Sequence, residues 1–201
     1  KGGYGSTKTY QATGINIYDK DGAAFTLNGN LDMKVKGVGV DMRGSEKNAV
    51  TIAGGTIFTP DDGEEASYKA VAATSGTFAM GMNDAKTGSN GKDVVVQGTI
   101  SLGKKGTVDL GLGSSKSRWT GIADNKDGHP MNLYLSDGGM WENRRTSKDQ
   151  YGLFAGSRVT KVAGGTAPAK AGVIVQKDSN PITIDHYSGH TILVYDHEAS
   201  S

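Results

Sequence analysis

Short stretches of alternating apolar and polar residues run along most of the chain. Apolar residues stand at every second position in residues 31–35, 38–42, 108–112, 131–135 and 182–184. A strand places successive side chains on opposite faces of a sheet, so this period of two predicts strands with one buried face. We find no stretch with the apolar period of a helix, and Gly, Asn and Asp separate the strands, as turns require. The pattern therefore predicts an all-β protein.

A short motif recurs at nearly constant spacing in the first half. Gly-Thr-Ile at residues 55–57 recurs as Gly-Thr-Phe at 76–78 and as Gly-Thr-Ile at 98–100, at steps of 76 − 55 = 21 and 98 − 76 = 22 residues. A period near twenty with short strands is typical of one turn of a parallel β-helix, whose turns stack ~4.8 Å apart. The alternative is a β-sandwich in which the Gly-Thr pairs recur by coincidence.

The second half is less periodic and carries both tryptophans, Trp119 and Trp141. Polar loops are predicted at residues 123–130 and 142–150, and residues 164–170 (GGTAPAK) predict an excursion loop. Because the last turn of a solenoid needs a cover, this loop-rich half is the expected cap.

Four segments of the second half form an ordered, recognisable series. They read SRWTGIAD at 117–124, MNLYLSDGGMWEN at 131–143, SRVTKV at 157–162 and GVIVQKDSNPITIDHYSGHTILVYDHE at 172–198. Over about residues 114–198 the series resembles the C-terminal part of the passenger domains of bacterial autotransporters, the pertactin-like group. The Trp-Thr-Gly step, the Asn-Leu-Tyr-Leu strand and the Trp that follows it are the specific part of the resemblance.

The resemblance implies a right-handed parallel β-helix on the surface of a Gram-negative cell. It implies export through a C-terminal outer-membrane barrel of the same parent chain, with C-terminal turns that fold early as an autochaperone. Carried onto this chain, residues 1–113 would be β-helix turns, and residues 114–201 would be a continuous C-terminal cap and autochaperone-like segment. Residues expected in the core or cap, without a catalytic role, are Trp119, Gly121, Leu133, Leu135 and Trp141.

Composition limits the function classes. The chain has 201 residues, and 22 Lys and Arg nearly balance 21 Asp and Glu, which argues against nucleic-acid binding. The absence of cysteine excludes thiol chemistry and thiolate metal sites. The chain shows no signal peptide and no apolar run long enough to span a bilayer, so we expect an excised passenger fragment.

Three of the four histidines, His186, His190 and His197, lie close together in the sequence with Asp185, Asp196 and Glu198. Imidazoles and carboxylates are metal ligands. A hairpin that turns at Ser188-Gly189 would place His186 and His190 on opposite faces of the strand pair. We therefore expect polar strand ends and no metal site.

Other charged stretches have a simple structural interpretation. Residues 19–22 (DKDG) and 124–128 (DNKDG) resemble pieces of calcium loops but lack the full set of oxygen ligands, and Asp and Gly also suit tight turns. Residues 60–65 (PDDGEE) predict a solvated acidic loop, and Arg144-Arg145 predict a solvated basic pair.

An enzyme is not expected. Parallel β-helices that cut acidic polysaccharides need carboxylates or basic groups clustered on one outer face. Gly-x-Ser-x-Gly and Gly-Asp-Ser-Gly motifs are both missing, so no serine nucleophile is indicated and no cofactor is expected. The outward charged positions are mixed in sign, spread out and expected to be solvated: Asp32, Lys34, Lys36, Asp41, Arg43 and Asp109.

The sequence therefore predicts a surface-displayed adhesin that binds a host or bacterial surface glycan or protein, or else a stalk that binds nothing. The alternative from another class is a β-helical polysaccharide-degrading enzyme. Loops carry recognition in such scaffolds. The candidate binding loops, chosen by position alone, are residues 60–65, 83–92, 123–130 and 142–150.

Overall fold

The computed structural model describes residues 12–61, 68–147, 156–177 and 181–196. These residues are nearly all strand, with one short 3₁₀ helix, η1, at Pro168–Lys170. The strands are β1 (Ala12–Tyr18), β2 (Ala24–Lys34), β3 (Gly37–Arg43), β4 (Ala49–Phe58), β5 (Lys69–Met80), β6 (Val94–Gln97), β7 (Thr99–Leu112), β8 (Arg118–Gly121), β9 (Ala123–Asp124), β10 (Met131–Leu135), β11 (Met140–Asn143), β12 (Ser157–Ala163), β13 (Gly172–Gln176), β14 (Ile182–Ser188) and β15 (Thr191–Tyr195). The predicted all-β character is confirmed.

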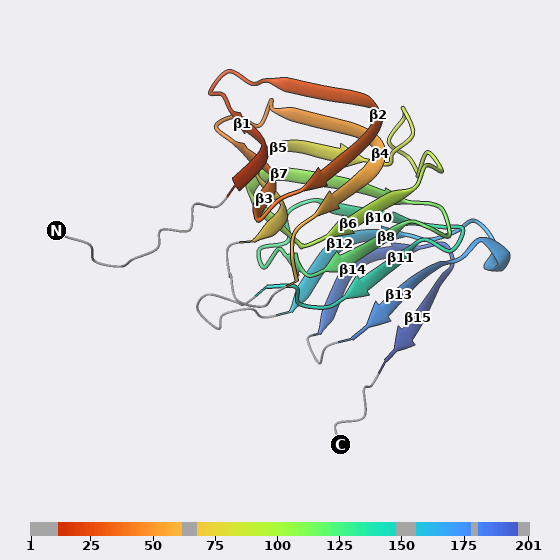
Figure 1. Cartoon of the computed structure of the whole chain (residues 1–201). Coiled ribbons are helices and arrows are strands. Elements are labelled where there is room, and N and C mark those ends of the chain that lie inside the picture. Colours follow the sequence, from red (N-terminus) through yellow and green to blue (C-terminus); the bar gives the residue numbers. More distant parts are fainter. Residues whose placement is uncertain (1–11, 62–67, 148–155, 178–180, 197–201) are drawn as a thin grey trace.

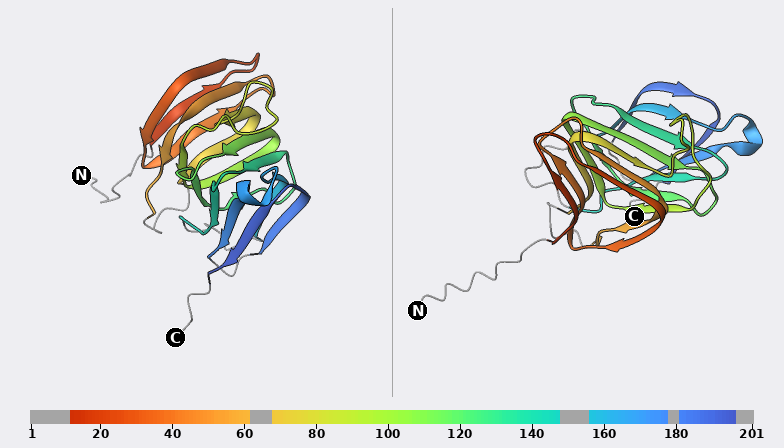
Figure 2. Two further views of the ribbon diagram at one scale, coloured as in Figure 1. Left: turned by 90° about the vertical axis from the view of Figure 1, so that its right-hand side faces the viewer. Right: turned by 90° about the horizontal axis from the view of Figure 1, so that it is seen from above.

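All 15 strands belong to one parallel, strongly curled sheet. Each segment pairs with a segment that comes later in the chain: Ala24 pairs with Ala49, Ala49 with Thr77, and Thr77 with Thr107. These steps are 49 − 24 = 25, 77 − 49 = 28 and 107 − 77 = 30 residues. Figure 2 shows the result, a stack that advances from β1 and β2 at one end to β14 and β15 at the other.

The long strands β2, β4, β5 and β7 bend, so that their two halves belong to different ladders, and three ladders of stacked strands result. Ladder A contains β1, β3, the first halves of β5 and β7, and β9. Ladder B contains the first halves of β2 and β4, the second halves of β5 and β7, then β10, β12 and β14. Ladder C contains the second halves of β2 and β4, then β6, β8, β11, β13 and β15.

The core consists of apolar side chains stacked in register along each ladder. Paired residues in a sheet point to the same face, so one apolar position in each turn builds a continuous row. The row of ladder C is Met33, Ile57, Val96, Trp119, Trp141, Ile174 and Leu193. The row of ladder B includes Ile52, Met80, Leu110, Leu133 and Val162. All of these except Leu193 are buried.

The Gly-Thr motif does not mark the turns of the stack. Thr56 pairs with Val95 in ladder C, Thr77 with Thr107 in ladder B, and Thr99 with Lys69 in ladder A, so the three copies lie in three different ladders. The motif is therefore not the repeat, although single turns of the stack do have steps in the low twenties: Val96 pairs with Trp119 and Trp119 with Trp141, at 119 − 96 = 23 and 141 − 119 = 22 residues. Gly55, Gly76 and Gly98 instead stand where the chain passes from one ladder to the next, with φ of 107°, 99° and 137°. Glycine adopts such values without the strain a side chain would cause.

The hairpin predicted at Ser188-Gly189 is also wrong. β14 pairs parallel with β12, and β15 pairs parallel with β13. The two strands belong to ladders B and C, and Gly189, at φ 75°, turns the chain between them. Within the described residues, β14 and β15 end the stack and no further layer covers them.

Candidate functional site

A prominent loop, residues 81–93 between β5 and β6, projects at the bend between ladders B and C (Figure 1, yellow-green). We call it the display loop. Its tip is closed by Asn83, whose Oδ1 accepts a hydrogen bond from the Thr87 backbone N–H at 2.9 Å and whose Nδ2 donates to Thr87 Oγ1 at 3.1 Å. The Lys86 N–H donates to Asn83 O, with Lys86 at φ 54°. These bonds hold the tip in one conformation.

The base of the display loop is fixed to the stack. Asn90 Nδ2 donates to Ala53 O in β4 at 2.8 Å, and the Asn90 N–H donates to Gly81 O at 2.8 Å. Gly81 has φ 71°, and a Cβ there would lie 2.4 Å from Gly111 O. Only glycine fits this close approach, so the loop is anchored at both of its ends.

An open groove of about 630 Å³ runs between the display loop and the neighbouring edge of the stack. A second hollow of about 410 Å³ adjoins it, and Lys92 lines both. On the other side of the loop, a hollow of about 260 Å³ separates it from residues 163–166, and Tyr134 Oη donates to Lys86 O at 3.3 Å. The polar residues that line the main groove are Asn28, Thr51, Asn83, Asp84, Lys86, Ser89, Asn90 and Lys92.

This lining suits a ligand rich in hydroxyl groups. The amide of Asn28 can both donate and accept hydrogen bonds, and the hydroxyl groups of Thr51 and Ser89 line the same groove. The amides of Asn83 and Asn90 shape the groove, because their hydrogen bonds lie within the display loop and to β4. Asp84 is the only carboxylate in its lining. A glycosidase of the usual kind needs two carboxylates across the scissile bond, and the second carboxylate near this groove, Asp93, lines the adjoining hollow.

Comparisons with models of known protein families, with curated proteins and with solved structures find no match to this chain. The resemblance to autotransporter passengers therefore stays a prediction from the sequence.

The five residues expected in the core or cap are all buried. Trp119 and Trp141 stack with ring centroids 4.9 Å apart. Gly121 precedes the turn into β9, and Leu133 and Leu135 belong to β10 in ladder B. Their positions place them in the stacked interior, away from the groove.

The histidines do not form a metal site in the described chain. His186 and His190 are exposed, and nowhere in the described ranges do three or more His, Asp or Glu side chains gather closely enough to hold a metal ion. Asp185 binds Arg158 through two hydrogen bonds of 3.1 Å. His197 and Glu198 lie outside the described residues.

The two segments that resemble calcium loops are turns held by their own side chains. Asn125 is buried, and its Oδ1 accepts from the His129 N–H at 2.9 Å while its Nδ2 donates to His129 O at 2.8 Å. In the first segment Asp19 Oδ1 accepts from the Asp21 N–H at 2.7 Å.

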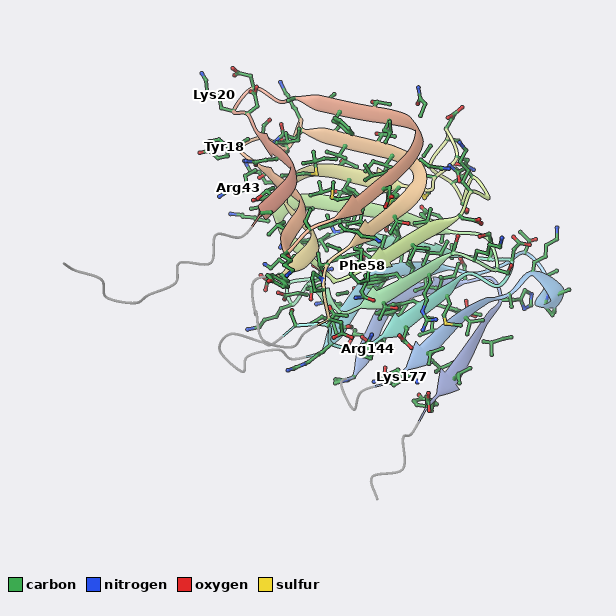
Figure 3. All side chains as sticks on the ribbon, in the orientation of Figure 1. Tyr18, Lys20, Arg43, Phe58, Arg144 and Lys177 are labelled. Carbon is green, nitrogen blue, oxygen red and sulfur yellow. The ribbon has the colours of Figure 1, made fainter. Side chains whose placement is uncertain are left out.

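Arg144 is not a solvated residue, contrary to the prediction. It forms ion pairs with Asp61 and with Glu142, whose Oε1 lies 3.5 Å from Arg144 Nε, and Glu142 also binds Arg118 at 2.8 Å. Burial by itself would lower the pKa of Arg144, but the hydrogen bonds and charges of Asp61 and Glu142 outweigh it and raise that pKa. Figure 3 shows Arg144 among the side chains near ladder C. The cluster ties the start of the predicted acidic loop, of which residues 62–65 lie outside the described residues, to β11.

Four of the six charged residues expected to be outward and solvated are exposed. Asp32, Lys34, Lys36 and Arg43 are exposed, and Asp41 lies 3.4 Å from Arg43. Asp109 is buried, contrary to the prediction, and accepts a hydrogen bond from Asn132 Nδ2 at 2.8 Å. A neighbouring turn of ladder B supplies that donor, which the sequence pattern alone does not reveal.

Of the four candidate loops, residues 83–92 line the main groove, whereas residues 62–65 and 148–150 of two others lie outside the described residues. Two Asn and two Gly residues in this segment favour a tight, hydrogen-bonded loop. The partner side of the groove, at Asn28 and Thr51, comes from turns far away in the sequence. Among the described residues no helix has the length and apolar character to cross a membrane.

Proposed function

We propose that this chain is part of the passenger domain of a Gram-negative autotransporter and folds as a right-handed parallel β-helix. Every pairing between its strands is parallel, and the in-register core rows run through successive turns, as a β-helix requires. Parallel strands joined by crossovers are right-handed in nearly all proteins. The resemblance over residues 114–198 supplies the family, with display on the outer cell surface and export through a barrel of the parent chain.

The proposed activity is adhesion, through binding of a surface glycan in the groove beside the display loop. The observation that carries it is the groove itself: a rigid loop that carries Lys92 faces Asn28 of β2 across an open, polar hollow on the flank of the stack. A rigid site loses little conformational entropy when a ligand binds, so an open groove can still give useful affinity.

The test is a glycan and extracellular-matrix array, read both for binding and for release of products. We expect saturable binding without turnover. A groove variant with Asn28→Ala and Lys92→Ala, both exposed, should lose that binding. The matched control carries Asn16→Ala and Lys36→Ala, which are also exposed but lie outside the groove lining.

Three other results of the array would each replace the proposed function or move the proposed site. Product release would replace the adhesin with the polysaccharide-degrading enzyme. A wild-type protein that binds nothing on the array would be a stalk. Binding that survives the groove variant would move the site away from the display loop.

A further inference from the structure

Exposed apolar side chains gather at the C-terminal edge of the stack. Five of the seven large exposed apolar residues in the described chain belong to the last turn: Tyr187, Ile192, Leu193, Val194 and Tyr195. Leu193 is 51% exposed, although its ladder neighbour Ile174 is only 2% exposed. Leu193 thus occupies a core position of ladder C that no further turn of the described chain covers.

The edge strand β15 also lacks the charges that usually protect an edge. Its five residues, TILVY, carry no charged side chain, and the Asp196 carboxylate that follows is bound by Lys177. In β14, Asp185 is bound by Arg158 of the preceding turn. A strand at the edge of a sheet that carries no charge is a template for another strand.

We propose that this edge binds a second copy of the chain, with the two β15 strands paired antiparallel about a two-fold axis. If the pairing is centred on Leu193, that residue faces its own copy and Ile192 faces Val194 in both directions. Opposite residues of an antiparallel pair point to the same face of the sheet. Leu193 would therefore be covered by its own copy on the core side, and Ile192 would be covered by Val194 of the second copy on the outer side. The same surface serves both copies, which closes the assembly at two.

The N-terminal edge is a poorer partner for this surface. The half of β2 in ladder C carries Asp32 and Lys34, both exposed. That end of the stack includes a strand of ladder A, β1, whereas the described C-terminal end consists of β14 and β15 from ladders B and C. Two C-terminal edges therefore match each other better than a C-terminal edge matches an N-terminal one. This inference does not depend on the proposed function.

The test is sedimentation velocity of the purified chain across a wide range of concentrations. We expect a monomer–dimer equilibrium. Val194→Lys should raise the Kd of dimerisation by roughly 10-fold or more, since it places a cation in the uncharged edge. Thr26→Lys, at an exposed position in β2 at the opposite end, should leave the Kd unchanged. Thermal unfolding by circular dichroism checks that both variants fold.

A second measurement does not depend on the charge variants. The chain has no cysteine, so Leu193→Cys provides a single thiol that should form a covalent dimer under mild oxidation. Thr26→Cys should stay monomeric. A wild-type chain that remains monomeric, assemblies that grow beyond two copies, or a Val194→Lys variant that dimerises like the wild type would each overturn the proposal.

Discussion

The indole rings of Trp119 and Trp141 lie face to face, with centroids 4.9 Å apart and planes 5° from parallel. Each ring also repeats the same polar contact: Nε1 of Trp119 donates to Gly98 O and Nε1 of Trp141 donates to Gly121 O, both at 3.0 Å. The two residues are paired neighbours in ladder C, 141 − 119 = 22 residues apart. Each turn thus fastens its tryptophan to a glycine that comes one turn earlier in the chain.

Loss of the indole N–H should destabilise the protein even when another aromatic side chain replaces the tryptophan. Trp141→Phe leaves Gly121 O buried without its donor and leaves part of the ring volume empty, so we expect a loss of about 1–3 kcal/mol. Trp141→Ala should cost about 3–5 kcal/mol. Urea unfolding followed by circular dichroism measures both. Tyr18→Ala, at a 73% exposed residue, is the control; equal effects at both sites would contradict the role of the stack.

Substitution by alanine should destabilise the protein at a bend glycine but not at a glycine in open space. Gly55 has φ 107°, and a Cβ there would lie 2.1 Å from Leu31 O. Gly29, in β2, has no atom within 4 Å of such a Cβ. Gly55→Ala should cost about 1–3 kcal/mol or more through backbone strain and the clash. Gly29→Ala should be neutral or stabilise by about 0.4–1 kcal/mol. The unfolding midpoint in urea measures the difference, and a neutral Gly55→Ala would contradict the tight bend.

Glu142 should contribute more to stability than Arg118, one of the two arginines that bind it. Its carboxylate is buried and serves both Arg118 and Arg144, so Glu142→Ala leaves two guanidinium groups without that partner and should cost about 1–3 kcal/mol. The Arg118 side chain is 48% exposed, so Arg118→Ala should cost less than about 1 kcal/mol. Thermal unfolding of the two variants gives the comparison, and the reverse order would show that Arg118 and not Glu142 is the centre of the cluster.

The C-terminal half should be the more stable half if it acts as a folding nucleus. Both tryptophans lie at residues 119 and 141, so their fluorescence reports that half alone, whereas far-ultraviolet circular dichroism reports all strands. Stability differs along quasi-one-dimensional stacks. We therefore expect the fluorescence transition at a higher urea concentration than the circular dichroism transition. Coincident transitions would favour one cooperative unit without a separate nucleus.

The strands could be predicted because apolar and polar residues alternate within each strand's own sequence. Alternation at 31–35, 38–42 and 131–135 gives β2, β3 and β10. The order of stacking could not be obtained in this way, since loops of different length separate the turns. The copies of Gly-Thr therefore look like a repeat while they stand at three different bends.

The site was the least predictable part. The display loop was a candidate by its position alone, and the groove exists only because Asn28 and Thr51, from earlier turns, face it. The contact of Arg144 with Asp61 joins residues 83 positions apart, and no local pattern signals such a pair. The hairpin at Ser188-Gly189 failed because local turn chemistry competed with parallel pairing to the preceding turn, which prevailed.

The stacked order of the turns is the central claim, and cysteine pairs test it most directly in a chain that has none of its own. Thr56→Cys combined with Val95→Cys joins paired neighbours of ladder C that are 95 − 56 = 39 residues apart. Thr56→Cys combined with Met140→Cys places the second thiol several strands along the same ladder. With a short thiol-bridging fluorophore, we predict rapid cross-linking of the first pair and none of the second. Failure of the first pair to cross-link in the folded protein would contradict the parallel stack.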